Sequence, residues 1–283
     1  MKNFLSIPKN NNITNIAIGK FDGIHLGHQQ ILDSLRENSA IIIIDNHTKD
    51  FLTSINDRFL RLKNTYPNLY LLELESIKHL EGSAFIAMLL ELLPKLETIV
   101  VGYDFRFGHN RGFSGNDIAN FFKGRVIIIP QVKYNEIPLH SSTIKDLIRH
   151  GDIAISNAML GWNYTIKGEV IKGQGLASQK LFATLNIQTS GYVLPSSGVY
   201  ASLTDDEMSV SFIGNRLSTD KQFAIETHII GKAHIPHKHS IRITFLKKIR
   251  DNRHFSDLQT LKAQIRQDIA QAKEILESSF HKS

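Results

Sequence analysis

The stretch IAIGKFDGIHLGHQQIL, residues 16–32, runs from an apolar segment typical of a strand into a segment typical of a helix. At such a junction in an open α/β sheet, free backbone N–H groups and the helix dipole favour an anion. His25 and His28 can donate ring N–H bonds to phosphate oxygens, and Gly27 lets a phosphate approach the backbone. The stretch therefore predicts a polyphosphate site.

Two other interpretations of the histidines are open at this point. They could be surface or helix-capping residues, or they could bind zinc. No third histidine or carboxylate stands at helical ligand spacing, which disfavours zinc. Their place directly after the first strand favours the phosphate site.

Short β-branched runs alternate with helix-period stretches through the first half of the chain. The runs are ITNIAIG (13–19), AIIII (40–44), LYLLEL (69–74), TIVVG (98–102) and RVIII (125–129). Most are apolar on both faces, as in a covered parallel sheet. Between the third and fourth runs, apolar residues repeat at helical spacing from Ala84 to Leu92, before Pro94. This order predicts a doubly wound α/β domain.

After about residue 160 the pattern changes to successive short strands with glycine or turn residues between them. The expected strands lie in YTIKGEVIKG (164–173), GVYASL (198–203), MSVSFIG (208–214), FAIETHII (223–230) and SIRITFLKKI (240–249). They predict a small antiparallel barrel or sandwich. Apolar residues at helical spacing from Phe255 to Ile275 predict a C-terminal helix, with a possible capping box of Ser256 and Gln259. We expect domains at 1–155 and 156–283.

Composition narrows the class of protein. The chain has 283 residues, of which 42% are hydrophobic, and no cysteine, which excludes a disulfide framework and thiolate metal sites. No signal peptide or membrane-length apolar run is present, so a cytoplasmic protein is expected. The formal net charge of +6 is dispersed, so it does not choose between a solvated surface and a phosphate-bearing partner. We expect neither nucleic acid nor membrane as partner, and the sequence indicates no oligomeric state.

Two sequence blocks resemble one known family. GKFDGIHLGHQ (19–29) is similar to the N-terminal signature of the bacterial bifunctional riboflavin kinase/FAD synthetases, and VVGYDFRFGHNRGFSGN (100–116) resembles a second segment of them. The resemblance implies an FMN adenylyltransferase (nucleotidyltransferase) domain followed by a riboflavin kinase-like barrel. It implies that His25 and His28 are catalytic. It also implies that five residues bind the nucleotide or the flavin: Gly19, Phe21, Asp22, Gly27 and Gly102.

The second block also has a physical interpretation, because it follows a strand at the sheet edge where ligands bind. Asp104 could hold a ribose hydroxyl or a metal-bound water, and Arg111 could meet a phosphate. Phe105 or Phe107 could stack on a planar ring. The alternative is a buried aromatic turn with a structural Asp–Arg pair.

A third block, IPLHSSTIKDLIRHGD (137–152), resembles the family segment Ile-Ser-Ser-Thr-x-Ile-Arg. His140 replaces the first serine, Ser141 and Ser142 stand for the next two residues, and Lys145 replaces the arginine. A helix N-terminus with hydroxyls remains an anion site, but lysine lacks the bidentate guanidinium fork. The alternative is an ordinary serine N-cap.

The second half resembles the kinase domain unevenly. Thr184 and Asn186 are retained as oxygen ligands for Mg²⁺, and Glu226 in IETHI (225–229) falls at the catalytic base. The motifs GVYA (198–201) and IGNR (213–216) also match. Departures from the family pattern occur at Ala177, Ser178, Leu181 and Ala183. Three histidines in HIPHKHS (234–240) replace a family stretch and form either a solvated loop or a phosphate contact.

The resemblance implies adenylyl transfer from ATP to FMN, and phosphorylation of riboflavin to FMN by the barrel. The substrates expected are ATP, FMN and riboflavin, with Mg²⁺. In this scheme His25 and His28 stabilise the leaving pyrophosphate and Lys145 shares the developing charge. Two alternatives stay open: a monofunctional FAD synthetase whose barrel is a kinase relic, and a non-catalytic nucleotide- or RNA-binding module.

Overall fold

The computed structural model describes residues 1–171, 182–218, 220–232 and 239–280. Its contacts divide the chain into two compact units, Met1–Ser141 and Ser142–Ser283. Each unit is considered separately below. The division falls at the start of helix α5 (Ser141–His150), whereas the sequence pattern predicts a domain boundary at 155/156. Helix α6 (Ile153–Leu160), which spans that predicted boundary, packs on a strand of the second unit.

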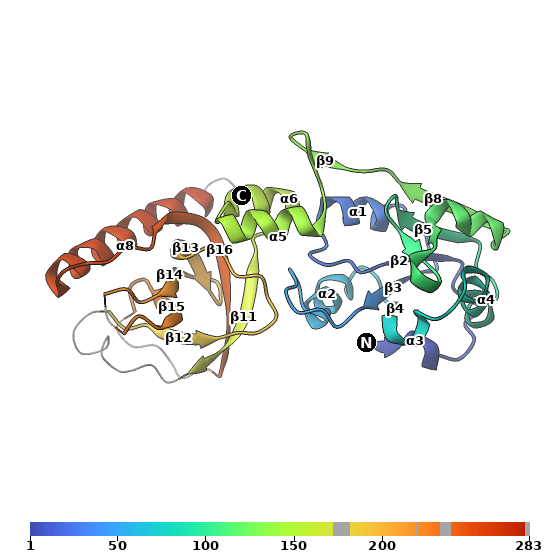
Figure 1. Cartoon of the computed structure of the whole chain (residues 1–283), viewed down its shortest axis with the longest axis horizontal. Coiled ribbons are helices and arrows are strands. Elements are labelled where there is room, and N and C mark those ends of the chain that lie inside the picture. The colour runs from blue at the N-terminus through green and yellow to red at the C-terminus, as the bar shows by residue number, and fades with distance from the viewer. Residues whose placement is uncertain (172–181, 219, 233–238, 281–283) are drawn as a thin grey trace. The chain divides into compact units, whose positions relative to one another are not determined.

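The first unit is built on a parallel sheet with strand order β1-β4-β3-β2-β5-β8 (Figure 1). Its strands are β1 (Lys2–Asn3), β2 (Asn15–Gly19), β3 (Ser39–Asp45), β4 (Leu69–Glu73), β5 (Thr98–Gly102) and β8 (Arg125–Ile129). The five strands expected from the sequence are confirmed. The two-residue edge strand β1 is additional.

Helices cover both faces of this sheet, which confirms the doubly wound α/β class. The longer helices are α1 (Leu26–Asp33), α2 (Ile55–Leu62) and α4 (Gly82–Leu92), with α3 (Leu74–Ile77) as a single turn. Alternate strand residues enter two cores. Ile41 and Ile43 pack in the core that holds apolar residues of α1 and α2, whereas Ile42 packs in the core that holds those of α4.

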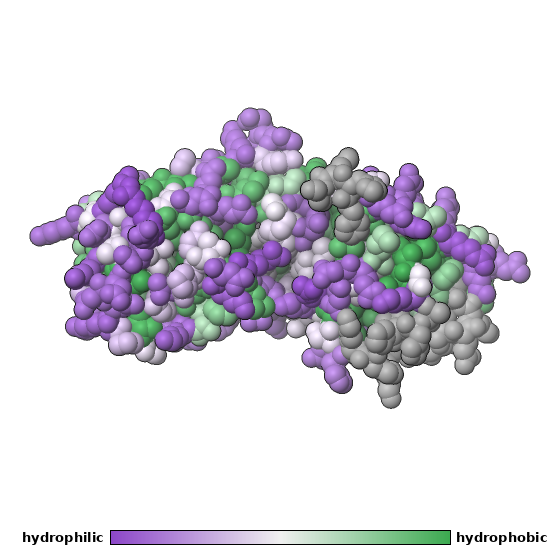
Figure 2. Space-filling model, turned by 180° about the vertical axis from the view of Figure 1, so that it is seen from behind, coloured by the Kyte–Doolittle hydropathy of each residue, from purple (hydrophilic) through white to green (hydrophobic). Residues whose placement is uncertain are grey.

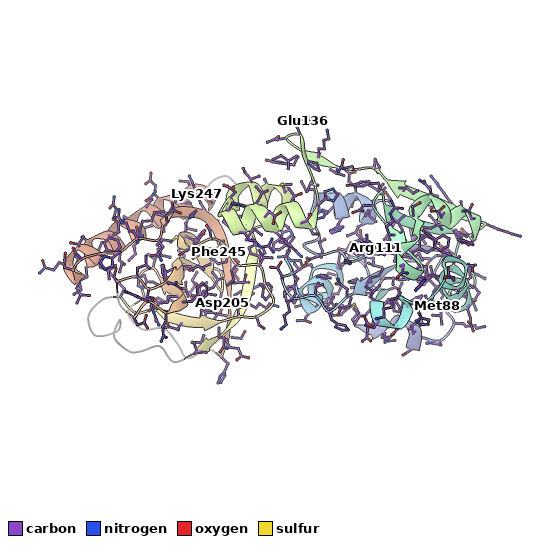
Figure 3. The ribbon with its side chains drawn as sticks, viewed as in Figure 1. Met88, Arg111, Glu136, Asp205, Phe245 and Lys247 are labelled. Carbon is purple, nitrogen blue, oxygen red and sulfur yellow. The ribbon has the colours of Figure 1, made fainter. Side chains whose placement is uncertain are left out.

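Shorter elements complete the first unit. They are η1 (Phe4–Ser6), β6 (Arg106–Phe107), η2 (His109–Arg111), β7 (Phe113–Ser114), η3 (Gly115–Asn120), β9 (Lys133–Tyr134) and β10 (Ile137–Pro138). β9 and β10 form a hairpin whose tip residues Asn135 and Glu136 have φ of 47° and 64° (Figure 3). Such left-handed pairs suit a two-residue hairpin turn. The hairpin returns the chain toward His140.

The second unit is a closed barrel with strand order β11-β12-β15-β14-β13-β16. The strands are β11 (Thr165–Ile171), β12 (Leu185–Gln188), β13 (Gly198–Thr204), β14 (Glu207–Asn215), β15 (Phe223–Ile229) and β16 (Ser240–Asp251), all paired antiparallel. Because the sheet closes on itself, the second unit is a barrel and not a sandwich, the two folds that the sequence left open. Tyr164, Tyr200 and Phe245 pack together as buried rings (Figure 3 labels Phe245).

The C-terminal helix α8 (Leu258–Phe280) packs on β13, β14 and β16. Its buried side chains are Asp268, Ala272 and Leu276. Asp268 is 2% exposed and pairs with Arg250 of β16, at 2.7 Å from Nη2 to Oδ2. The expected capping box is wrong: Asp257 caps the helix, because its carboxylate accepts from the amides of Gln259 and Thr260 at 2.9 and 2.8 Å.

Five hydroxyl groups form a closed hydrogen-bonded ring inside the barrel. Its members, each at most 1% exposed, are Ser202, Thr204, Ser209, Ser211 and Thr227. Successive oxygens, in the order 204-209-202-211-227-204, lie 2.8 to 3.0 Å apart. All five hydroxyls can point the same way round the ring, so that each donates once and accepts once. A fully satisfied buried network of this kind stabilises the barrel interior, whereas a broken one leaves a polar atom unpaired.

Surface composition is mixed, and hydrophilic and hydrophobic residues are interspersed over the face shown in Figure 2. Within the described residues, no helix has the length and apolar character required to span a membrane.

We expect Thr227→Val to lower the free energy of unfolding of the barrel by about 1–3 kcal/mol, because it keeps the side-chain shape but leaves the Ser211 hydroxyl without its acceptor. Trp162 is the only tryptophan of the chain and lies in the second unit, so its fluorescence during denaturant unfolding reports on this barrel.

Thr244→Val is the matched control, because the hydroxyl of Thr244 is half-buried and bonds to the hydroxyl of Thr165 outside the ring. Equal and small losses in the two variants would show that the ring contributes nothing as a unit.

Candidate active sites

The loop that joins β2 to α1 has an unusual backbone. Phe21, Gly23 and Ile24 have φ of 51°, 88° and 42°. A positive φ is strained for a bulky or β-branched residue and persists only where the surroundings impose it. The Phe21 ring is fully buried, and a Cβ on Gly19 would lie 3.4 Å from it. The buried Phe21 ring therefore anchors the loop to the core, and Gly19 leaves room for that ring.

Asp22 and Arg58 hold this loop to the start of α2. The Asp22 Oδ1 atom accepts from the amides of Leu52 and Thr53 at 2.9 and 3.0 Å, and from Arg58 Nη2 at 3.1 Å. Arg58 also donates to the carbonyls of Lys20 and Thr53, each at 2.8 Å. Burial lowers the pKa of Arg58, and the charge of Asp22 opposes this effect. The observed contacts of the Asp22 carboxylate are thus internal to the protein, and its predicted ligand contact stays a prediction.

His25 and His28 lie together at the N-terminus of α1. His25 is the N-cap, and its Nδ1 accepts from the His28 amide at 3.3 Å. The two rings stack with centroids 3.7 Å apart and planes inclined by 17°. A Cβ on Gly27 would lie 3.2 Å from the His25 ring. A side chain at residue 27 would thus crowd the His25 ring by a few tenths of an ångström, so the glycine favours the stack, in addition to the phosphate approach expected from the sequence.

Both histidines are neutral at physiological pH. Burial, and then the charge on His140, lower the pKa of His25 to about 4, although Asp22 opposes the shift. Burial, then the charges on His25 and Arg58, hold the pKa of His28 well below its usual value. The Nδ1 atom of His28 is buried and has no hydrogen-bond partner in the part of the chain that the structure describes. A buried polar atom without a partner at a helix N-terminus is a ready contact for a ligand.

The second sequence block lies beyond β5, at the carboxyl edge of the sheet. A Cβ on Gly102 would lie 3.1 Å from Asp104 Oδ1, so the glycine leaves room for that carboxylate. The Asp104 side chain is 63% exposed and faces His140 Nδ1 at 3.8 Å. Arg111, labelled in Figure 3, is exposed at φ 58° and has no ion-pair partner within residues 1–171 or the other described ranges. Both charges are accessible to a ligand.

The two phenylalanines of this block are core residues. Phe105 and Phe107 are 9% and 5% exposed, and their rings stack with centroids 5.9 Å apart. This agrees with the buried aromatic turn that the sequence left open as the alternative, but the Asp–Arg pair of that alternative is not formed, since Asp104 faces His140. Stacking of Phe105 on a ligand ring stays a prediction. The packing of Phe105 in the core does not support it.

The third block reaches the first through Ser141, whose Oγ donates to the Asp22 carbonyl at 2.8 Å. Ser141 is also the first residue of α5. Ser142 is exposed and Lys145 half-buried on the same helix. These two residues belong to the second unit, and their part in the first site stays a prediction. Sequence reasoning missed Arg58, because nothing in the local pattern around it signals a contact 36 residues away.

A second group of functional residues lies on the barrel. Asn186 of β12 is paired directly with Glu226 of β15, so their side chains share one face, and Thr184 lies two residues before Asn186. Glu226 Oε1 accepts from Arg216 Nη1 at 3.0 Å. Arg216 also binds Asp220, with Nη2 at 2.7 Å from Oδ2. Burial opposes the charge of Arg216, but the bonds to Asp220 and Glu226 outweigh it and raise its pKa.

These oxygen donors fit a magnesium ion. Amide, hydroxyl and carboxylate oxygens are the ligands that Mg²⁺ takes from proteins, and most of its remaining ligands come from water and phosphates. Among the described residues, no group of three or more histidine, aspartate or glutamate side chains could hold a metal ion. A divalent ion at the barrel site would therefore combine the oxygens of Thr184, Asn186 and Glu226 with water and phosphate oxygens. Sequence reasoning assigned no role to Arg216, although it lies in the matching motif IGNR.

Some predicted positions lie outside the described residues. They are Ala177, Ser178, Leu181, His234 and His237. Beside this gap, the carbonyl of Ala183 is 2.8 Å from His228 Nδ1 on β15. This contact ties the segment that leads to Thr184 to the strand that carries Glu226.

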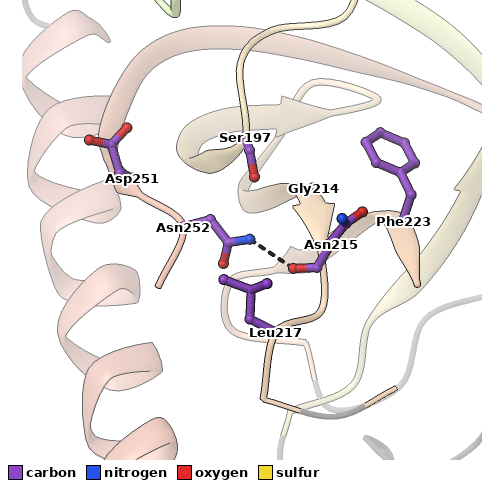
Figure 4. Close-up of a pocket in the computed structure, with 7 residues that line it drawn as sticks. All are labelled: Ser197, Gly214, Asn215, Leu217, Phe223, Asp251 and Asn252. Carbon is purple, nitrogen blue, oxygen red and sulfur yellow. Dashed lines mark hydrogen bonds between the residues drawn. The ribbon is translucent and has the colours of Figure 1, made fainter. Parts of the chain in front are cut away.

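A pocket of about 390 Å³ opens where β14 ends and β15 begins (Figure 4). Its lining residues are Ser197, Gly214, Asn215, Leu217, Phe223, Asp251 and Asn252. Phe223 is 56% exposed, and Asn252 Nδ2 donates to the Asn215 carbonyl at 2.7 Å. Its volume is in the range of small-molecule sites, which often occupy the mouths of barrels.

Comparison with known proteins assigns each half to a family. The riboflavin kinase family model matches residues 160–276, and the FAD synthetase family model matches residues 7–143. Among curated relatives, the bifunctional riboflavin kinase/FMN adenylyltransferase of Mycoplasma pneumoniae is 29% identical over 91% of this chain and 95% of its own. The enzymes of that name from Buchnera aphidicola (subsp. Schizaphis graminum) and Escherichia coli K12 are each 27% identical, covering 93% and 92% of this chain and 94% and 91% of theirs.

A solved structure shares the fold. A Streptococcus pneumoniae chain described as a macrolide-efflux protein superposes with a TM-score of 0.85 at 22% identity, over 96% of this chain and 97% of that one. Both family models occur in the order of the two units, and the curated relatives span nearly the whole chain. The chain therefore belongs to the bifunctional riboflavin kinase/FMN adenylyltransferase family.

Proposed function

We propose that this chain makes FAD from FMN and ATP in its first unit, and FMN from riboflavin and ATP in its barrel. The observation that carries the proposal is the stacked pair at the N-terminus of α1, in which His25 is buried and His28 is half-buried with an unpartnered, buried Nδ1. The names of the relatives support both reactions. We place the protein in the cytoplasm and retain 1–155 and 156–283 as its functional domains, with no nucleic acid or membrane partner.

In adenylyl transfer, a phosphate oxygen of FMN attacks the α-phosphorus of ATP, and the bond to the bridging oxygen of pyrophosphate breaks. The enzyme needs no covalent nucleophile, because positioning and charge stabilisation carry most of such a reaction. His25 and His28 hold the leaving pyrophosphate through ring N–H groups and the free amides of α1. Arg111, Lys145, Ser141 and Ser142 complete the anion contacts.

In the kinase reaction, the terminal ribityl hydroxyl attacks the γ-phosphorus of ATP, and ADP leaves. Glu226 takes the hydroxyl proton, and Arg216 orients its carboxylate. Thr184 and Asn186 would hold Mg²⁺ beside that carboxylate. When bound, Mg²⁺ neutralises phosphate charge as the bond to the leaving group breaks. The pocket beside Leu217 and Phe223 would take the flavin ring, since it combines apolar walls with amide groups.

We expect His28→Ala to slow FAD formation from FMN and ATP at least tenfold, and as much as about 100–1,000-fold, because it removes one transition-state donor. The rate of FAD formation by the purified protein is measured by chromatography. His47→Ala is the control, because the His47 side chain is 60% exposed and pairs with Asp45, not with His25 or His28. A wild-type rate in the His28 variant would remove the phosphate role assigned to this pair.

The buried, neutral state of His25 also predicts how stability depends on pH. Its pKa is about 4 in the folded protein and about 6.5 when unfolded, so the unfolded chain binds more protons between these values. The stability due to this residue is complete above pH 6.5 and is lost as pH falls toward 4. At pH 5 the loss is about 2 kcal/mol relative to pH 7.

Denaturant unfolding followed by circular dichroism at pH 7 and pH 5 measures this loss. His25→Asn keeps an N-cap acceptor and removes the titrating ring, so the difference between the two pH values should shrink by about 2 kcal/mol. An unchanged pH dependence in this variant would show that His25 is not the residue that titrates.

We expect Glu226→Gln to abolish FMN formation from riboflavin and to leave FAD formation from supplied FMN nearly unchanged. The amide cannot accept the proton, whereas the first site contains no part of Glu226. Both products are quantified with saturating Mg-ATP, and Glu169→Gln, an exposed residue of β11, is the control. Equal loss of both activities would contradict two independent sites, and a wild-type protein that converts no riboflavin would make the barrel a kinase relic.

A further inference from the structure

Tyr103 is the accessible aromatic residue of the second sequence block. It follows β5 directly and is 41% exposed, whereas Phe105 and Phe107 are buried in the core. An aromatic side chain at the carboxyl edge of a parallel sheet stands where ligands of such sheets bind. Tyr103 therefore offers the ring surface that the two phenylalanines cannot.

The Tyr103 ring is held in place by residues from two other segments. Its hydroxyl lies 2.8 Å from Gln131 Nε2 and 2.6 Å from His140 Nε2. Gln131 follows β8 and also lies 3.1 Å from His140 Nε2. An exposed ring tethered from two sides is preorganised for stacking, because little side-chain entropy remains to be lost on binding.

The hydrogen bonds fix the direction of the Tyr103 hydroxyl. Gln131 Nε2 donates to the Tyr103 oxygen at 2.8 Å, which leaves the hydroxyl proton directed at His140 Nε2, 2.6 Å away. On its other side, His140 Nδ1 faces Asp104 Oδ2 at 3.8 Å. Burial and the charge of Asp104 raise the pKa of Tyr103, so its hydroxyl stays protonated and acts as a donor.

The tethered ring also lies in the electrostatic range of the first site. The charge on His140 lowers the pKa of His25, which caps α1. Both substrates of adenylyl transfer carry a planar heteroaromatic ring in addition to phosphates. We propose, on the basis of the proposed function, that Tyr103 is the platform on which one of these rings stacks, with Gln131 and His140 as its positioning residues.

Kinetics of FAD formation test this proposal in the full chain, because this reaction reports on the first site alone. Tyr103→Ala should raise the KM for one substrate at least about fivefold, the lower end expected for one ring stacked on an aromatic side chain, with kcat little changed. A rise confined to the KM for FMN identifies the isoalloxazine ring, and a rise confined to the KM for ATP identifies adenine. Tyr103→Phe should keep the KM near wild type, because it keeps the ring.

Leu60→Ala is the matched control, since Leu60 is also 41% exposed in the first unit and lies on α2. Tyr103→Leu repeats the test with apolar bulk but no aromatic face, should the alanine variant fold poorly. Unchanged KM values, an equal rise in both, or a fall in kcat alone would overturn the platform. A wild-type protein that forms no FAD would instead contradict the proposed function.

Discussion

Arg58 reaches 36 residues back along the chain to hold Asp22, and the geometry of the first site depends on this contact. The pair is buried, with side chains 7% and 9% exposed, so loss of either partner leaves a charge without compensation. The pair also holds the loop in which Phe21 and Ile24 have a strained, left-handed backbone conformation, and without it these residues would return to a negative φ. Because α1 begins directly after this loop, the ion pair sets where the helix N-terminus and its two histidines point.

The barrel positions its residues by a different constraint. Strand register places Asn186 opposite Glu226, and one residue later Thr227 faces the opposite side, into the hydroxyl ring. A slip of one residue in β15 would exchange the two side chains, burying a carboxylate and exposing a ring member. The hydroxyl ring and the outward-facing glutamate therefore specify the same strand register. Closure of the sheet also removes the free edges at which a slip of register could begin.

The sequence predicted the strands of the first unit well, because runs such as TIVVG and RVIII are apolar on both faces and leave one interpretation. It missed β12, whose four residues LNIQ are too few and too mixed to show a period. The spacing of His25 and His28 was visible locally. Arg58 was not, since a contact between distant segments leaves no trace in local spacing.

The aromatic residues of the second block show where local pattern stops being informative. Three aromatic residues stand at every second position of the block: Tyr103, Phe105 and Phe107. Their spacing alone therefore does not predict which of the three rings contacts a ligand. The difference arises from their surroundings: Phe85 and Phe113 pack around Phe107, whereas the Tyr103 ring meets only the tilted His140 ring, with centroids 5.7 Å apart, and stays 41% exposed. Which aromatic ring is accessible is thus decided by Phe113 inside the block and, outside it, by α4 and the segment before α5.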